Sequence, residues 1–138
     1  MLPDVEAEVD QTREVTVQFV SMNNAGMIWE FGPRQRQVTV HPGELMEVAF
    51  YARNPTDRTM IAQAIPSVSP MKAAALLHKT ECFCFNQQEL GPGEEIEMPL
   101  RFFVDQALPA DVNKLTLSYT LFDITENFNK SGKTLSAN

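Results

Sequence analysis

Apolar and polar residues alternate with a period of two through several separate stretches of the chain. The clearest stretches are residues 13–20, 45–54, 94–104 and 114–123. Apolar side chains at every second position are the pattern of a strand with one buried face, typically in an antiparallel sheet. The residues predicted to face the core are Val15, Val17, Phe19, Met46, Val48, Phe50, Ile96, Met98, Leu100, Phe102, Val104, Leu115, Leu117, Tyr119 and Leu121.

Proline and glycine residues separate these predicted strands. His-Pro-Gly-Glu at 41–44 and Gly-Pro-Gly-Glu at 91–94 each place Pro-Gly ahead of an alternating stretch. Proline presets one turn dihedral and glycine accepts the positive φ of the next position, as in a type II turn. Two further breaks, at 31–35 and 53–57, also contain proline. Roughly seven to nine short strands at this spacing predict an all-β fold, an immunoglobulin-like β-sandwich.

One segment departs from the alternation. Residues 67–79, SVSPMKAAALLHK, predict a short helix with Ser69 as N-cap and Pro70 in the first turn. His78 and Lys79 would lie in its last turn, where cations complement the helix dipole. The residues that follow, 80–86, predict another strand.

The two cysteines of the chain, Cys82 and Cys84, fall in this last predicted strand. Alternation would place both sulfurs outward on one face, and Phe83 and Phe85 in the core. Two residues of strand span about 6.6–6.8 Å, which reaches the upper limit of the roughly 4.4–6.8 Å between the Cα atoms of a disulfide. An internal disulfide would therefore require the strand to buckle, and removing either outward thiol should cost little stability.

Two thiolates on one face can instead converge on a metal ion. Soft thiolates favour Cu(I), zinc or an iron–sulfur cluster, but zinc and such clusters usually take four ligands. Cu(I) accepts low coordination numbers, so it suits a two-sulfur site best. His78, four residues before Cys82, and Met98, in an alternating core pattern, are weaker candidate ligands. A thiol–disulfide oxidoreductase and a plain interaction module with structural cysteines remain alternatives, although the C-x-x-C at a helix start that oxidoreductases use is missing.

Composition narrows the class of protein. The chain has 138 residues, 43% hydrophobic and 21% charged, which is typical of one globular domain. Its net charge of -7 argues against a nucleic-acid partner and favours a positively charged protein surface. No apolar run approaches the roughly 18 residues of a membrane span, and no hydrolase or phosphate-binding motif is present, so a non-enzymatic role is expected.

Residues 79–105, KTECFCFNQQELGPGEEIEMPLRFFVD, together with LTLSYTLFD at 115–123, resemble the copper-delivery assembly factors of cytochrome c oxidase, the CtaG family. Upstream stretches, including WEFGPRQRQVTVHPGE, are similar to the same family, so the resemblance covers roughly residues 13–123. The combination of Cys-Phe-Cys-Phe, a Pro-Gly-Glu turn, Met-Pro and Phe-Phe-Val-Asp is specific.

The resemblance implies that Cys82 and Cys84 bind Cu(I) and deliver it to the copper B centre of oxidase subunit I. It implies a copper donor protein as a second partner, and it is consistent with a copper-bridged homodimer. Family members carry one N-terminal membrane helix, with the globular part on the periplasmic side of the bacterial inner membrane or, alternatively, in the mitochondrial intermembrane space. Their further cysteine near that anchor is absent from this chain.

These implications divide the chain into three parts. Residues 1–12 are expected to follow a missing membrane anchor, residues 13–123 to form the copper-binding domain, and residues 124–138 to form a flexible tail. The absence of the anchor-proximal cysteine leaves the ligand set of the family incomplete in this chain.

Overall fold

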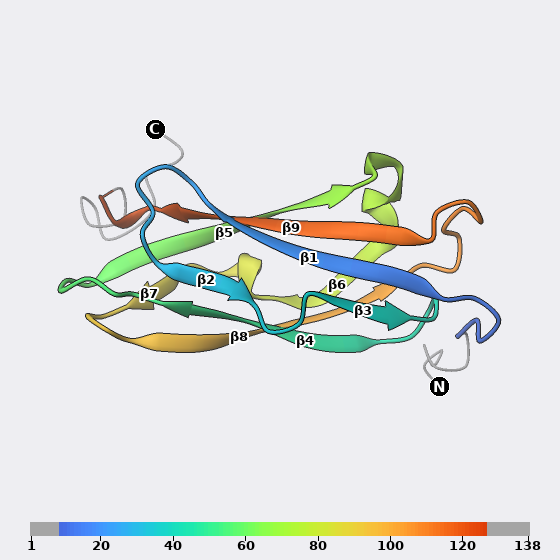
Figure 1. The fold of residues 1–138 in the computed structure, drawn as a ribbon, viewed down its shortest axis with the longest axis horizontal. Helices are drawn as coiled ribbons and strands as arrows, with labels where there is room; N and C mark the ends of the chain where they lie inside the picture. The colour runs from blue at the N-terminus through green and yellow to red at the C-terminus, as the bar shows by residue number, and fades with distance from the viewer. Residues whose placement is uncertain (1–8, 127–138) are drawn as a thin grey trace.

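The computed structural model describes residues 9–126, and nine strands in two sheets make up just over half of these residues (Figure 1). The strands are β1 (Val15–Asn23), β2 (Glu30–Pro33), β3 (Gln37–Val40), β4 (Met46–Arg53), β5 (Met60–Ser69), β6 (Leu77–Cys82), β7 (Gln88–Leu90), β8 (Glu95–Val104) and β9 (Lys114–Asp123). Two short 3₁₀ helices, η2 (Met71–Leu76) and η3 (Phe83–Phe85), flank β6.

The two sheets form a sandwich. One sheet has the strand order β3-β1-β9-β5-β7 and the other has the order β2-β4-β8-β6. In Figure 1 the sheet containing β1, β5 and β9 lies above the sheet containing β4 and β8, with the core between them. The predicted all-β, immunoglobulin-like sandwich is confirmed.

The residues that the alternation predicts to face the core are buried, except that Met46 and Ile96 are only partly buried. The core also contains residues that the alternation did not single out, among them Trp29, Met60 and Leu90. The period of two works here because each sheet has one face against the other sheet and one face in water. The long strands β8 and β9 show this most clearly, with every second residue buried along most of their length.

Both Pro-Gly-Glu turns have the predicted geometry. Gly43 has a φ of 90° and Gly93 a φ of 71°, in the region that glycine tolerates best. The backbone N–H of the last residue donates to the carbonyl of the first at 2.9 Å in turn 41–44 and at 3.1 Å in turn 91–94. In each turn the glutamate side chain also accepts the N–H of the first residue.

One strand pair runs against expectation. β1 and β9 pair in parallel, with Val17 opposite Leu115, whereas the alternation predicted antiparallel strands. Parallel neighbours need a long connection, and here nearly the whole domain lies between the two strands. The direction of a pairing between the first and last strands is therefore set by the topology and leaves no local trace in the sequence.

The helix predicted over residues 67–79 is wrong. Only the six residues of η2 are helical, Ser69 is the last residue of β5, and His78 and Lys79 lie in β6. Leu77 is buried and pairs with Val104 of β8. Pairing with β8 and burial of Leu77 outweigh the helix propensity of the alanines, which is a weak local preference.

No helix within residues 9–126 has the length and hydropathy of a membrane span. Residues 1–8 and 127–138, which hold most of the predicted N-terminal segment and of the predicted flexible tail, lie outside the described residues. The assignment of 13–123 as the copper-binding domain remains a prediction.

Candidate metal centre

The cysteine motif lies where β6 leaves its sheet. β6 pairs with β8 as far as Cys82, which is opposite Leu100, and the chain then turns into η3. The backbone N–H of Cys84 donates to Cys82 Sγ at 3.2 Å, which closes the first turn. The strand predicted over residues 80–86 is therefore wrong beyond Cys82, and the two cysteines do not share a strand face.

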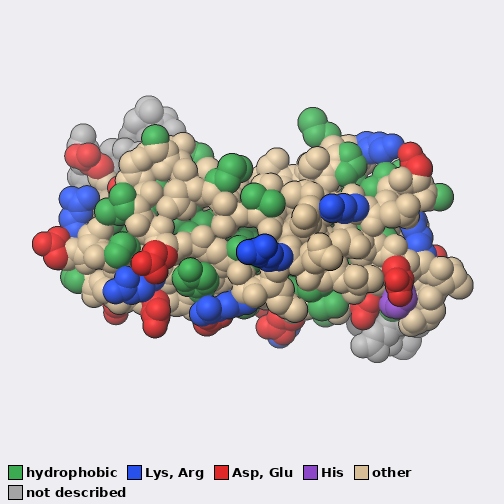
Figure 2. All heavy atoms as spheres, in the orientation of Figure 1, with side chains coloured by type: hydrophobic (Ala, Val, Ile, Leu, Met, Phe, Trp, Pro, Cys, Tyr) green, Lys and Arg blue, Asp and Glu red, His purple; other side chains and the backbone are tan. Residues whose placement is uncertain are grey.

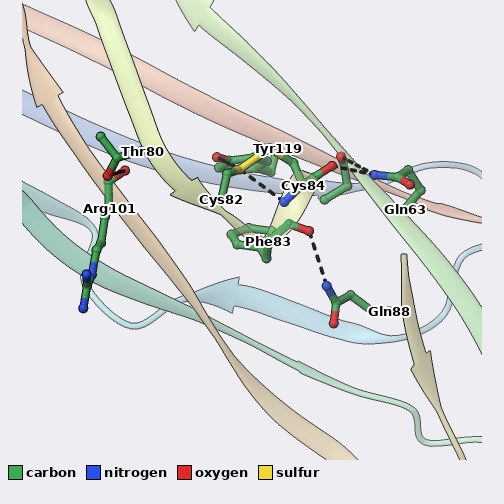
Figure 3. The surroundings of a disulfide bond; sticks show 9 residues. Gln63, Thr80, Cys82, Phe83, Cys84, Gln88, Arg101 and Tyr119 are labelled. Atoms are coloured by element: carbon green, nitrogen blue, oxygen red, sulfur yellow. Dashed lines mark hydrogen bonds between the residues drawn. A yellow bond between two sulfur atoms is a disulfide. The ribbon is translucent and has the colours of Figure 1, made fainter. Parts of the chain in front are cut away.

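Cys82 and Cys84 form a disulfide in this structure (Figure 3). Their Cα atoms are 5.1 Å apart, well below the two-residue span of a strand and within the usual disulfide range. The expectation that an internal bond is disfavoured is wrong, because the 3₁₀ turn supplies the buckle that an extended strand would have needed.

The two sulfurs occupy different environments. Cys82 is only 3% exposed and belongs to the core, whereas Cys84 is half-buried. The predicted outward orientation is wrong for Cys82, because this residue still belongs to β6 and pairs with Leu100 of β8, whose side chain faces the core. The predicted burial of Phe83 is confirmed, while the side chain of Phe85 lies outside the described part of the structure.

Tyr119 on β9 contacts the buried sulfur. Its hydroxyl oxygen lies 3.0 Å from Cys82 Sγ, and it must be the donor because a disulfide sulfur has no proton. Burial raises the pKa of Tyr119 well above its ordinary value, so the hydroxyl keeps its proton. The ring packs on Phe83 and Phe50, with centroid separations of 4.6 Å and 5.2 Å.

Two glutamine side chains donate hydrogen bonds to the backbone of η3. Gln63 on β5 donates to the carbonyl of Cys84 at 2.9 Å, and Gln88 on β7 donates to the carbonyl of Phe83 at 3.3 Å. The two side-chain amides therefore link η3 to the sheet that contains β5 and β7, whereas β6, which precedes η3, belongs to the other sheet (Figure 3). These hydrogen bonds hold the backbone of the cysteine motif in place and do not involve the sulfur atoms.

A cavity of about 190 Å³ opens beside Cys82. Met98 forms part of its wall and is otherwise buried, as the alternation predicted for a core residue. The cavity is lined by Glu81, Cys82, Phe83, Asn86, Gln88, Ile96, Glu97, Met98 and Pro99.

The surface around this cavity carries charged side chains that form ion pairs with one another. Glu97 and Glu81 line the cavity and pair with Arg34 and Arg101, and Arg101 also pairs with Glu47. The hydrogen bond from Arg34 lowers the pKa of Glu97, which remains ionised at neutral pH. In Figure 2 acidic and basic side chains alternate along the edge where β4 and β8 lie. Exposed ion pairs of this kind add little to the stability of the fold. Their main effect is on the distribution of charge over this surface.

His78 is not brought to the sulfurs. Cys82 comes four positions after His78 in β6, which corresponds to about 13 Å along a strand. Its Nε2 lies 2.9 Å from Asp105, and its ring stacks on Phe103 at 4.8 Å. A backbone hydrogen bond from Ala107 lowers the pKa of Asp105, and the contact with His78 adds to this effect. Within residues 9–126 no group of three or more histidine, cysteine or acidic side chains is placed to hold a metal.

Sequence reasoning missed Tyr119, Gln63 and Gln88 as parts of this site. Tyr119 was predicted only as a core residue, although a buried phenol requires a hydrogen-bond partner. The identity of that partner depends on how β9 faces the turn after β6, and the two segments lie in different sheets. The glutamines carry no pattern in the sequence that would single them out.

The described part of the chain is a β-sandwich domain with two cysteines at the turn that follows the edge strand β6. Residues 3–123 match the family described as "Cytochrome c oxidase assembly protein CtaG/Cox11". The chain belongs to this family, and the resemblance seen in the sequence is confirmed.

Relatives come from bacteria and from a plant. The chain is 44% identical over 113 residues to the cytochrome c oxidase assembly protein CtaG of Cereibacter sphaeroides, covering 78% of this chain and 59% of that protein. It is 41% identical over 120 residues to the CtaG of Mesorhizobium japonicum, covering 83% and 58%. It is 40% identical over 119 residues to the mitochondrial assembly protein COX11 of Arabidopsis thaliana, covering 83% and 42%. The chain thus spans about half the length of these relatives.

Proposed function

We propose that this chain takes part in cytochrome c oxidase assembly as a non-enzymatic copper chaperone. In this role Cys82 and Cys84 bind Cu(I), and the ion is delivered to the copper B centre of oxidase subunit I. Membership of the assembly-protein family supports the first part. The observation that carries the second part is the placement of two sulfurs on one tight turn, with Cys82 in the core and Cys84 only half-buried.

Copper binding requires the reduced form of the site. A disulfide offers no thiolate, so two electrons must first convert Cys82 and Cys84 to thiols. Cα atoms 5.1 Å apart allow both sulfurs to reach one ion at a metal–sulfur distance of about 2.3 Å. Soft thiolates suit Cu(I), which tolerates two ligands.

The unequal burial of the sulfurs suits the transfer of an ion. Cys82 lies in the core, whereas Cys84 is half-buried and is therefore the more exposed of the two ligands. An acceptor ligand therefore displaces Cys84 first, and Cys82 releases the ion last. A site with few ligands leaves room for the incoming ligand, so the ion passes on by exchange and is never free.

The partners and the location follow from the same proposal. A copper donor protein loads the site, and subunit I of the oxidase receives the ion. The net charge of -7 favours partners with positively charged surfaces. In the full-length protein a membrane anchor holds this domain on the periplasmic side of the bacterial inner membrane, or alternatively on the intermembrane-space side of the mitochondrial inner membrane.

Metal selectivity tests the proposal. We expect the reduced chain to bind about one Cu(I) ion and to prefer it strongly to zinc, because two sulfurs satisfy Cu(I) but not a tetrahedral zinc ion. The measurement is a titration under anaerobic conditions, with the bound metal quantified for each ion. Zinc binding as tight as copper binding would contradict the assignment.

Copper should also change the oligomeric state. A thiolate with two bonds retains lone pairs, so the accessible Cys84 of one chain can bridge to the copper of a second chain. We expect a monomer without metal and a dimer with Cu(I), since the net charge of -7 opposes association without the ion. Sedimentation of both forms at equal concentration measures this. A monomeric mass after copper loading would show that the ion stays on one chain.

A further inference from the structure

The outward side of the sheet that contains β1, β9 and β5 carries no charge over its centre. Two neighbouring rows of outward side chains cross these three strands, and they are Val20–Ser118–Ser67 and Met22–Thr120–Ile65. The rows on either side, through Thr116 and through Phe122, are also uncharged. These four rows are called the uncharged face below.

The centre of the uncharged face exposes large apolar side chains to solvent. Val20 is 37% exposed, and Met22 and Ile65, on either side of Thr120 in one row, are 50% and 48% exposed. From Thr116 to Phe122 the face is about 20–24 Å long and about 14 Å wide, which gives roughly 300 Å². A contiguous surface of this size with exposed apolar side chains is often an interaction site.

The outward side of the other sheet has the opposite character. Its central strands β4 and β8 present Glu47, Arg53, Glu95, Glu97 and Arg101. In Figure 2 charged side chains line the lower edge, where β4 and β8 lie, and the middle of the upper edge, near β5 and β9, shows none. A partner with a positively charged surface is attracted to the acidic groups of the β4–β8 side, so the uncharged face is not where such a partner gains most.

The charge of the chain favours a second copy of itself as the occupant of the uncharged face. Each copy has a net charge of -7, so two copies repel each other wherever their acidic groups meet. The centre of the uncharged face can meet its counterpart without bringing carboxylates together. A two-fold axis through Thr120 would place the row Met22–Thr120–Ile65 against the same row of the other copy, as in the packing of two sheets. We propose that the uncharged face is a contact surface for a second copy of this chain.

The size of the face sets the strength of the contact. A stable complex buries roughly 800 Å² on each partner, more than twice what this face offers, so the association is weak. The metal-free chain therefore remains monomeric at micromolar concentration and associates in the millimolar range.

The uncharged face borders the cysteine turn. Gln63, opposite Phe122, donates to the carbonyl of Cys84 at 2.9 Å. A copper link through Cys84 would raise the effective concentration of the two faces, so that a weak contact orients the two chains. In this respect alone the inference rests on the proposed function.

A concentration series of the metal-free chain with its disulfide intact tests the contact. Amide resonances are recorded by nuclear magnetic resonance as the protein is raised from micromolar to millimolar concentration. We expect progressive shifts for Val20, Met22, Thr120 and Ile65, and a slower rotational tumbling of the whole domain. Resonances that stay constant on this face, or that move mainly on the β4–β8 side, would overturn the proposal.

Ile65→Glu places a carboxylate at the centre of the face in both copies. We expect the dissociation constant of the self-association to rise at least tenfold, because apolar burial is lost and two like charges are brought together. Met22→Glu lies in the same row on another strand and should have the same effect, so the test does not depend on the folding of one variant.

Leu45→Glu is the matched control for these variants. Leu45 is exposed to the same extent as Ile65, at 48%, but precedes β4 of the other sheet. We expect its self-association to equal that of the wild type apart from the small effect of one added charge. An equal loss in the Leu45 and Ile65 variants, or no loss in folded Ile65 and Met22 variants, would contradict the assignment of the face.

Vesicles of neutral phospholipid distinguish the other occupant that an uncharged face could take. Shifts on this face with vesicles at micromolar protein, together with none on raising the protein concentration, would assign the face to a bilayer and overturn the proposal. All these measurements are made without copper. A chain that self-associates in this way but binds no Cu(I) would refute the proposed function and confirm the contact surface.

Discussion

Replacing either Cys82 or Cys84 by alanine should reduce Cu(I) binding from about one ion per chain to none that resists a competing chelator. One remaining thiolate cannot supply the two soft ligands on which the site depends. Within residues 9–126 no cluster of other metal-binding side chains could take over. Competition with a chromophoric Cu(I) chelator, under reducing conditions and without oxygen, gives the affinity of each variant.

His78→Ala is the matched control for this experiment. His78 is held by Asp105 and stacks on Phe103, so we expect its removal to leave copper binding unchanged. Untreated protein with its disulfide intact should bind no Cu(I) until a reductant is added. If the histidine variant lost the ion while the cysteine variants kept it, the proposed ligand set would be wrong.

The second large effect concerns stability. Phe83→Ala should lower the free energy of unfolding by about 3–5 kcal/mol, the usual cost of removing a buried aromatic side chain. Phe83 is buried and packs against Phe50 at 5.1 Å and against Tyr119 at 4.6 Å between ring centroids. Urea unfolding of the reduced protein measures the loss without a contribution from the disulfide.

Phe103→Ala provides the comparison for this prediction. Phe103 is only partly buried and stacks on His78 at the surface, so its removal should cost clearly less than that of Phe83. Equal losses in the two variants would mean that the turn after β6 is not anchored in the core.

The burial of Cys82 also revises the expectation that both thiols can be removed at little cost. With the disulfide reduced, Cys82→Ala empties part of the core, whereas Cys84→Ala changes a half-buried position. The structure therefore gives Cys82→Ala a larger loss of stability than Cys84→Ala, with both below that of Phe83→Ala.

The strands β1, β4, β8 and β9 and much of the core could be predicted from the sequence because burial on one face of a sheet repeats every two residues. That repeat is local, so it can be recognised within one short segment. Leu115, Leu117 and Leu121 show it in β9 without information from any other part of the chain. The Pro-Gly-Glu turns are local in the same sense, since Gly43 and Gly93 supply the positive φ that the turn requires. The cysteine motif and its resemblance to a known family were also visible in the sequence.

Three features were decided only by tertiary structure. β6 replaced the end of a predicted helix because Leu77 is buried beside β8, and that gain exceeds a local preference. The motif forms a 3₁₀ turn where the pairing of β6 with β8 ends at Cys82, and this turn brings the sulfurs close enough to bond. Tyr119 met Cys82 because two sheets pack face to face across the core. Contacts between segments distant in the chain leave no periodic signal, so the sequence determined which residues are buried, and only packing determined which of them meet.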